Sequence, residues 1–369
     1  MRLTSIVLLG LAAAGAWGAE LQPLSSAELC GRCHRAILEA WKSSAHARAM
    51  DSPLFQQGLE RTETEFGASA QQVCLACHSP ISVLTKDTAL LKKVSWEGVT
   101  CEYCHSIRDV SLAGPNPQVK VEFSLVKSGP LKDAVAPVHG TVFSAVYTSS
   151  AACAPCHEYQ NSLGFAVLTT YREWQNSRYG KEGRSCQSCH MYKVEGAVVD
   201  PKVKRSSEAK VNLHQMPGSH SLDMLNKTIK ARLVTAREGD QLKVSVEVAN
   251  AAAGHYVPTG SPMRQLLLEV LADSYDGNHY REERRYRRTV ADSRGNALTL
   301  EPAVFLKGAR VLSDTRLSPD EKRVETFSFP VPAGVQTQVR AELRYYYSPL
   351  ASSELQKSVT FLTIRRLVK

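Results

Sequence analysis

The chain has 369 residues, 43% of them hydrophobic, with a formal charge of +9, ten cysteines and eleven histidines. This length leaves room for two domains. The positive charge on its own is compatible with a nucleic-acid partner, an interpretation that the cysteine pattern removes below.

The first 19 residues have the pattern of an export signal. Met1 and Arg2 give a charged start, an apolar run follows from Leu3 to Ala16, and Ala19 is a small residue at a plausible cleavage point. The run is shorter than the roughly 20 apolar residues that span a bilayer as a helix. We therefore expect residues 1–19 to be a cleaved signal peptide and the mature protein to be soluble and either periplasmic or extracellular.

Residues 20–224 contain five copies of the motif Cys-x-x-Cys-His, which together use every cysteine in the chain. This pattern is typical of c-type haem attachment, in which the two thiols add to the porphyrin vinyl groups and the histidine binds the iron. The thiols are those of Cys30, Cys33, Cys74, Cys77, Cys101, Cys104, Cys153, Cys156, Cys186 and Cys189, and the motif histidines are His34, His78, His105, His157 and His190.

Other uses of these cysteines explain the pattern less well. Zinc would pair the Cys-x-x-Cys units into four-ligand sites, which an odd number of units does not allow, and zinc gives no reason for the histidine. Loops as short as Cys-x-x-Cys are poor structural disulfides. The sequence therefore predicts five covalently bound haem c groups, whose propionates bring about ten negative charges. These charges offset the basic residues and remove the argument for nucleic acid.

Six further histidines are candidates for the second axial position of the irons. A haem iron with one histidine commonly takes His or Met as its other ligand in electron transfer, and the number of spare histidines nearly matches the number of motifs. His279 lies in a predicted hairpin turn and is expected at the surface. The predicted distal ligands are His46, His139, His214, His220 and His255.

The surroundings of two of these histidines predict where they act. His46 follows His34 by twelve residues on an expected helix that shows Leu38 and Trp41 on one face, about 18 Å along its axis. It is therefore better placed for a neighbouring haem than for its own. His255 lies in a tight loop after an expected strand, and as a ligand it would fasten the C-terminal part to the haem-bearing part. The methionines Met50, Met216, Met224 and Met263 compete as ligands, but methionine is more often a packing residue.

From residue 225 the pattern changes to alternating apolar and polar residues. The strand candidates are residues 229–237, 241–248, 264–272, 304–312, 323–331, 339–345 and 359–367. Period-two alternation with turns between the runs predicts an antiparallel β-sandwich of the immunoglobulin-like kind over residues 225–369, after an α-helical, loop-rich haem domain over residues 20–224. The charged run 281–288 is either a solvated face or a docking patch for an acidic redox partner.

The chain resembles the multihaem cytochromes of the cytochrome c-554 family. The resemblance rests on the first motif leading into Trp41–Ala47, on Gly98–Ser106, on His139-Gly140 and Ser149–Cys153, on Cys186–Met191, and on the loop Gly254–Gly260, which is similar to one in members with a trailing β-domain. It implies closely packed haem pairs and mostly bis-histidine irons. The type member has four haems, one with an open iron, whereas this chain has five motifs. Some relatives stack into extracellular filaments.

These features predict an exported pentahaem electron-transfer protein, a relay or wire in respiratory or extracellular electron transfer, rather than an enzyme. Its expected partners are other redox proteins, either cytochromes or quinol-linked complexes, without nucleic acid or a membrane span. Two alternatives stay open: a multihaem reductase of nitrogen oxyanions or sulfur compounds with one open iron, and a homo-oligomer or filament subunit. Related pentahaem nitrite reductases use lysine in place of one motif histidine, and the five histidines here argue against that activity.

Overall fold

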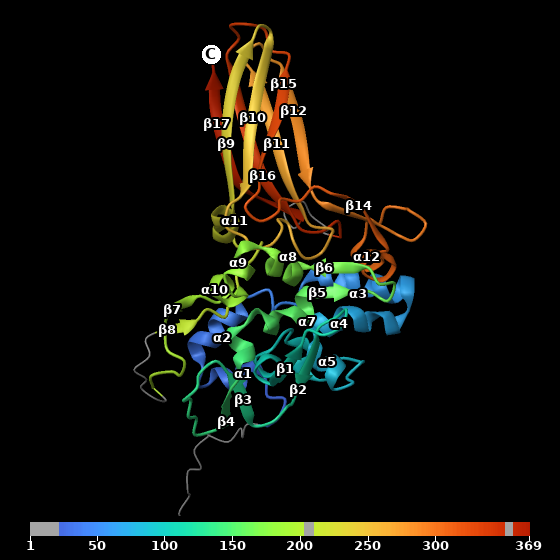
Figure 1. The fold of residues 1–369 in the computed structure, drawn as a ribbon, viewed down its shortest axis with the longest axis vertical. Coiled ribbons are helices and arrows are strands. Elements are labelled where there is room, and N and C mark those ends of the chain that lie inside the picture. Colours follow the sequence, from blue (N-terminus) through green and yellow to red (C-terminus); the bar gives the residue numbers. More distant parts are fainter. Residues whose placement is uncertain (1–21, 203–209, 351–356) are drawn as a thin grey trace, which may run out of the picture.

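The structure, a computed structural model, describes residues 22–202, 210–350 and 357–369. The predicted signal peptide lies outside these residues. Figure 1 shows two parts along the long axis, with the five motifs in a part made of short helices and a β-rich part standing on it. Within the described ranges no helix is both long and apolar enough to cross a membrane.

The motif-bearing part consists of short helices joined by loops and two-stranded sheets. Its helices are α1 (Ala27–Gly31), α2 (Arg35–Lys42), α3 (Pro53–Phe66), α4 (Gln71–His78), α5 (Pro80–Leu84), α6 (Cys101–His105), α7 (Ala154–His157), α8 (Thr170–Asn176), α9 (Arg178–Lys181) and α10 (Cys186–His190), with 3-10 turns at Ala68–Ala70, Lys93–Trp96, Ala145–Thr148 and Ser150–Cys153. Its strands pair as β1 (Ile107–Ser111) with β2 (Gln118–Val121), β3 (Val126–Gly129) with β4 (Gly140–Phe143), β5 (Glu158–Gln160) with β6 (Ala166–Thr169), and β7 (Lys193–Glu195) with β8 (Lys210–Asn212).

The motifs occupy helices of one or two turns. Helices α4, α6, α7 and α10 each end at a motif histidine, whereas the first motif begins on α1 and places His34 at the start of α2. Side-chain caps fix two of these starts, because Ser26 accepts a hydrogen bond from the backbone N–H of Leu29 and Thr100 accepts one from that of Tyr103. The chain therefore presents each thiol pair and its histidine as a compact local unit.

The β-rich part follows α11 (Leu222–Thr228), which lies across the expected domain boundary and leads directly into the first long strand. One sheet has the order β15-β10-β9 and the other the order β12-β11-β16-β17, with all neighbours antiparallel. The strands are β9 (Ile229–Glu238), β10 (Gln241–Asn250), β11 (Gln265–Ser274), β12 (His279–Tyr286), β15 (Lys322–Phe329), β16 (Thr337–Tyr346) and β17 (Ser358–Val368).

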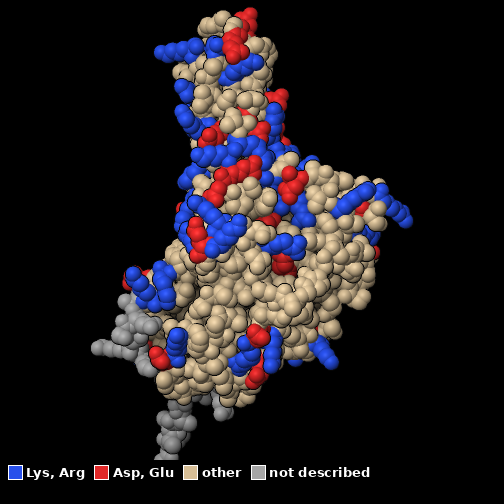
Figure 2. Space-filling model, in the orientation of Figure 1, with Lys and Arg blue, Asp and Glu red and all other residues tan. Residues whose placement is uncertain are grey.

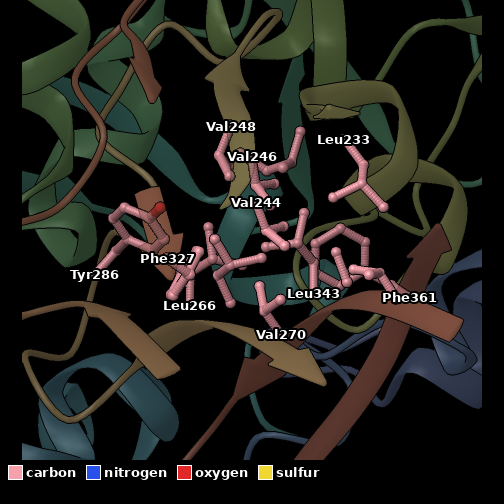
Figure 3. Close-up of a cluster of buried hydrophobic side chains, with 14 of the residues drawn as sticks. Leu233, Val244, Val246, Val248, Leu266, Val270, Tyr286, Phe327, Leu343 and Phe361 are labelled. Atoms are coloured by element: carbon pink, nitrogen blue, oxygen red, sulfur yellow. The ribbon is translucent and has the colours of Figure 1, made fainter. Parts of the chain in front are cut away.

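The two sheets enclose the largest apolar core among the described residues. Alternate residues of β16 are buried, as expected for a strand with one face on a core. Val244 and Val246 of β10 meet Leu266, Val270 and other residues of the facing sheet, as Figure 3 shows. These four side chains are fully buried, so the core holds the two sheets face to face.

A smaller apolar cluster joins the two parts of the molecule. Phe165 and Val167, on and beside β6, pack with Met263, Val290 and Val304 of the β-rich part. Val290 belongs to β13 (Arg288–Ala291), which pairs with β14 (Arg310–Asp314) beside the sandwich. The cluster gives the junction its own apolar contact, separate from the sandwich core.

Two local predictions are wrong. Residues 304–312 do not form one strand: α12 (Glu301–Lys307) begins with a proline in its first turn, which favours a helix start, and only then does β14 follow. The helix expected to carry His46 ends earlier, because α2 stops at Lys42 and His46 lies in a series of turns. The axial distance of a helix therefore does not apply to His46.

Candidate haem-binding site

The ten motif cysteines all have free, half-buried thiols, so each is available for a thioether bond. Thiols of different motifs also meet. The side chain of Cys30 lies beside that of Cys101, the side chain of Cys77 beside that of Cys156, and the side chain of Cys153 beside that of Cys186. The first motif therefore lies beside the third, the second beside the fourth, and the fourth beside the fifth.

Tyr103 links these groups. Its side chain is buried, and burial, followed by the nearby thiols of Cys156, Cys104 and Cys77, raises its pKa. Because Tyr103 lies inside the third motif, this contact brings that motif next to the second and fourth. The five motifs thus form one contiguous group in the folded chain.

Most of the motif histidines are held by backbone carbonyl groups. The Nδ1 atom of His34 lies 2.6 Å from the carbonyl oxygen of Val198, that of His105 2.7 Å from Ser128, that of His190 2.7 Å from Pro217, and that of His78 3.2 Å from Ala49. A carbonyl oxygen can only accept, so Nδ1 carries the proton and donates it. The lone pair is then on Nε2, the nitrogen that faces away and is free to bind a metal.

Three of the predicted distal histidines have the same arrangement. The Nδ1 atom of His214 donates to the carbonyl of Asn212 at 2.6 Å, that of His139 to Gly140 at 2.9 Å, and that of His255 to Tyr256 at 2.9 Å. Each of these carbonyls is within two residues of the histidine, so local backbone geometry sets the ring orientation. In these three residues, too, the lone pair is on Nε2 and can bind a metal.

Four motif histidines face four of the predicted distal histidines. The ring centres are 6.2 Å apart for His34 and His139, 6.3 Å for His46 and His157, 6.5 Å for His105 and His214, and 6.4 Å for His190 and His255. The planes meet at 37°, 86°, 23° and 17°, respectively. Pairs of nearly equal separation but different tilt point to a common group between the rings rather than to ring stacking.

This separation fits a metal held between two imidazoles. A histidine nitrogen binds a metal at about 2.0–2.1 Å and lies about 1.1 Å from the centre of its ring, given bonds of about 1.33 Å. Two rings on opposite sides of one metal therefore have centres about 6.3 Å apart. The residues present thus fit five thioether-bound haems, four with an imidazole on each side of the iron.

Burial favours the neutral form of six of the chain's imidazoles, and the neutral form is the one that binds a metal. Burial lowers the pKa of His214 to about 4 and that of His78 to about 4. Burial, followed by the nearby rings of His46 and His190, lowers the pKa of His157 to about 3. Burial likewise lowers the pKa values of His46, His105 and His255.

His78 differs from the other motif histidines. Its ring stacks on Phe55 with the centres 3.9 Å apart and an interplanar angle of 8°, and none of the chain's histidines, all of which lie in the described ranges, faces it at the separation of the four pairs. His220 instead stacks on Tyr347, with ring centres 4.5 Å apart. His279 is exposed and contacts Asp273, as expected for a surface residue.

Arg264 connects the surroundings of His78 and His220. After burial, its positive charge is the next cause that lowers the pKa of His220, to about 4, and it also acts on His78 and Tyr347. The guanidinium donates to the carbonyl of Thr259 at 3.4 Å. Arg264 therefore lies near the one motif histidine that has no imidazole opposite it, and also near the stacked pair of His220 and Tyr347.

Sequence reasoning did not find the supporting residues. Nothing in the motif pattern indicates Phe55, the carbonyl acceptors or the buried pair formed by Glu102 in the third motif and Lys127 on β3. One signal was available for this pair, since a glutamate within a haem motif is costly to bury without a cation.

The charged residues of the run 281–288 pair largely with residues nearby in the β-rich part, as Arg281 on β12 does with Glu269 on the adjacent strand β11.

Comparison with known proteins gives a family match for part of the chain and one similar solved fold. Residues 29–106 match the family model described as cytochrome c554 and c-prime. The fold is similar to the crystal structure of a penta-heme cytochrome c552 from Thermochromatium tepidum, with a TM-score of 0.75 and 23% identity over 94% of this chain and 100% of that one. A structure from the Northeast Structural Genomics Consortium, target SoR45, has a TM-score of only 0.19 at 8% identity and carries no weight. No curated protein sequence matches the chain.

Proposed function

We propose that the chain is a multihaem c-type cytochrome of the cytochrome c-554 family and that it acts as an exported pentahaem electron carrier. The family match over residues 29–106 and the similar fold of a penta-heme cytochrome support this proposal. The four facing histidine pairs, with ring centres 6.2–6.5 Å apart, carry the proposal. An iron with an imidazole on each side has no free position for a substrate. Haem held in this way supplies one-electron exchange, and two histidines favour a lower potential than His/Met ligation.

The protein's own residues orient the proposed axial ligands and place the five motifs next to one another. Carbonyl groups orient both imidazoles in three of the four pairs, so these ligands should change little between oxidation states. The contacts Cys30–Cys101, Cys77–Cys156 and Cys153–Cys186, together with Tyr103, bring every motif beside another. An electron that enters at one motif therefore has neighbours to pass to, which is what a relay needs.

Three measurements on the purified protein test this proposal. The mass of the mature chain should exceed that of the apoprotein by five haem masses. Electron paramagnetic resonance of the ferric protein should show at least four low-spin irons, and a redox titration should give mostly negative midpoint potentials. Five clearly positive couples, or a majority of high-spin irons, would contradict the electron-carrier proposal.

A reductase with one open iron is a second candidate, because His78 has no imidazole opposite it. Arg264 acts on His78 and so offers a cation near this motif to a small anion such as a nitrogen or sulfur oxyanion. Cyanide titration separates the candidates: binding at one iron, weakened in Arg264→Met, supports the reductase. Failure of cyanide to bind any iron would instead mean that all five are closed and would leave the pure carrier.

The β-rich part serves the carrier by supplying an axial ligand. His255 lies between β10 and β11 and faces His190 of the fifth motif. We place this part among the immunoglobulin-like sandwiches, a proposal supported by its three-stranded and four-stranded antiparallel sheets. His46 and His255 both face histidines of their own chain, which supports a self-sufficient protomer over a filament that exchanges these ligands. The partners we propose are other cytochromes or quinol-linked complexes in the periplasm or outside the cell.

A further inference from the structure

The loop that carries His255 is held by residues from both parts of the molecule. On the sandwich side, the side-chain amide of Asn250 donates to the carbonyl of His255 at 3.0 Å, and Val257 forms a β-bridge with Leu317. On the other side lies α8, which packs beneath the sandwich in Figure 1. The position of His255 therefore depends on how the two parts meet.

Glu173 of α8 is the buried centre of this junction. Its Oε2 atom accepts hydrogen bonds from the backbone N–H of Tyr256 at 3.1 Å and from the hydroxyl of Thr259 at 2.7 Å. The hydroxyl of Thr259 donates here, so at 2.9 Å it accepts from the hydroxyl of Thr170. One carboxylate oxygen thus fixes two points of the loop, one of them directly after His255.

The other carboxylate oxygen has one partner from the β-rich part and one from β6. Oε1 of Glu173 accepts from the guanidinium of Arg316 at 2.7 Å and from the hydroxyl of Thr169 at 2.7 Å. Only 5% of the Glu173 side chain and 8% of that of Arg316 are exposed, so neither charge has water as a substitute partner. Arg316 also lies over the ring of Tyr256, 4.6 Å from its centre, and pairs with Asp314.

We propose that Glu173 is the positioning residue for His255, and that it makes coordination of the fifth haem depend on the seating of the sandwich. The inference rests on the proposed function, specifically on His190 and His255 as the ligands of one iron. Tyr256 is fixed from its N–H side by Glu173 and accepts the Nδ1 proton of His255 through its carbonyl at 2.9 Å. If the carboxylate is lost, the loop loses two anchors and Arg316 loses a buried partner, so the imidazole leaves its place opposite His190.

The test uses the holoprotein with all five haems and counts ferric low-spin irons by electron paramagnetic resonance. His255→Ala should convert one iron in five from low-spin to high-spin. Glu173→Ala should convert most of the same iron, and added imidazole should restore the low-spin signal in both variants. Glu269→Ala is the matched control, because Glu269 is a largely buried carboxylate paired with Arg281 within the sandwich. It should leave the low-spin count unchanged.

Two further variants test whether Glu173 acts through His255. Glu173→Gln keeps the shape of the side chain and should still shift the signal of the same iron if Glu173→Ala does not fold. In the double variant Glu173→Gln/His255→Ala, the glutamine should add nothing to the change that His255→Ala causes. A folded Glu173→Ala or Glu173→Gln protein with the parent spectrum would overturn the inference while leaving the carrier proposal intact. If His255→Ala leaves the low-spin count unchanged, the ligand assignment itself fails.

Discussion

At the scale of single residues, the chemistry of the proposed axial histidines depends on the groups that their Nδ1 atoms contact. A carbonyl acceptor at Nδ1 makes the imidazole a stronger donor at Nε2 and fixes its plane. His105 and His214 each have such an acceptor, the carbonyls of Ser128 and Asn212. In the three pairs whose rings all have such an acceptor, the plane angles therefore follow from where the backbone places these carbonyl groups.

Replacing His214 by methionine should raise one midpoint potential. Thioether ligation stabilises ferrous iron relative to a second imidazole, and axial ligands shift haem potentials over a wide range. We expect His214→Met to move one of the five couples upward by on the order of 100 mV. A redox titration followed by optical absorption measures the shift. His279→Met is the control, since His279 is exposed at the end of β12. An unchanged set of five couples would remove His214 from the ligands.

Gly98 has a structural role that alanine cannot fill. Its φ of 69° lies in the left-handed region, and a Cβ there would collide with the carbonyl oxygen of His46. The neighbouring Val99 donates to that same carbonyl at 3.0 Å. Gly98 thus allows the backbone before the third motif to pass close to the segment that carries His46.

We therefore expect Gly98→Ala to destabilise the protein by more than the backbone cost alone, which is about 1–2 kcal/mol. Gly183→Ala is the matched control, because Gly183 has a φ of 72° and nothing near its missing Cβ. Denaturant unfolding of both variants separates the steric collision from the backbone cost. Equal losses of stability in the two variants would mean that the segment of His46 moves aside without penalty.

At the scale of elements, the buried pair of Glu102 and Lys127 joins α6 to β3. The ammonium lies 2.7 Å and 2.8 Å from the two carboxylate oxygens, and only 0% and 13% of the Glu102 and Lys127 side chains are exposed. Ser128, the next residue on β3, supplies the carbonyl that orients His105. The ion pair therefore keeps the strand at the right place for the third motif.

Lys127→Met should cost about 3–5 kcal/mol of unfolding free energy, because it leaves the Glu102 carboxylate buried without its cation. The double variant Glu102→Gln/Lys127→Met should lose less than Lys127→Met alone, since no unpaired charge remains. Denaturant unfolding of the single and double variants gives the coupling between the two residues. A double variant as unstable as the sum of the two single variants would show that the pair acts as two independent side chains.

The sequence was most informative where structure is set locally. The haem motifs are defined within five residues, and the alternation at 241–248 and 339–345 coincides with β10 and β16. Residues 304–312 alternate like a strand but begin inside α12, and the proline in the first turn of this helix was the signal for it. The assignment of His139 to His34 or of His214 to His105 has no local signal, because each pair joins distant segments through the fold. The role of Glu173 was hidden for the same reason, since its partners come from the other part of the chain.

At the scale of the whole molecule, charge and redox groups occupy different regions. In the view of Figure 2, Lys and Arg are dense over the sandwich and its base, while the motif-bearing part shows a largely uncharged surface. Many basic side chains of the sandwich are paired, as Arg284 is with Glu325 and Arg323 with Glu321. Internal pairing leaves the formal charge of +9 unchanged, so only the propionates that the proposed haems would bring offset it.

The many neutral, buried imidazoles should make the stability of the whole molecule fall with acid. Burial lowers the pKa of His214 to about 4, whereas an unfolded histidine has a pKa of about 6.5. Binding to iron acts in the same direction, because a ligating nitrogen cannot carry a proton. The folded pKa is the lower one, so the contribution is complete above about pH 6.5 and is lost as the pH falls from there toward the folded value.

Each distal histidine released on unfolding should therefore contribute up to about 1.4 kcal/mol of lost stability per pH unit below about pH 6.5. Burial lowers the pKa values of His46 and His255 as well, so several protons should be taken up together. Guanidinium unfolding at pH 7.5, 6 and 5 measures the slope. His214→Met removes one titrating group and should reduce the slope by about one proton, whereas His279→Met should leave it unchanged because His279 is a surface residue. A stability that is flat between pH 7.5 and 5 would mean that these imidazoles keep their iron, and so stay unprotonated, in the unfolded chain.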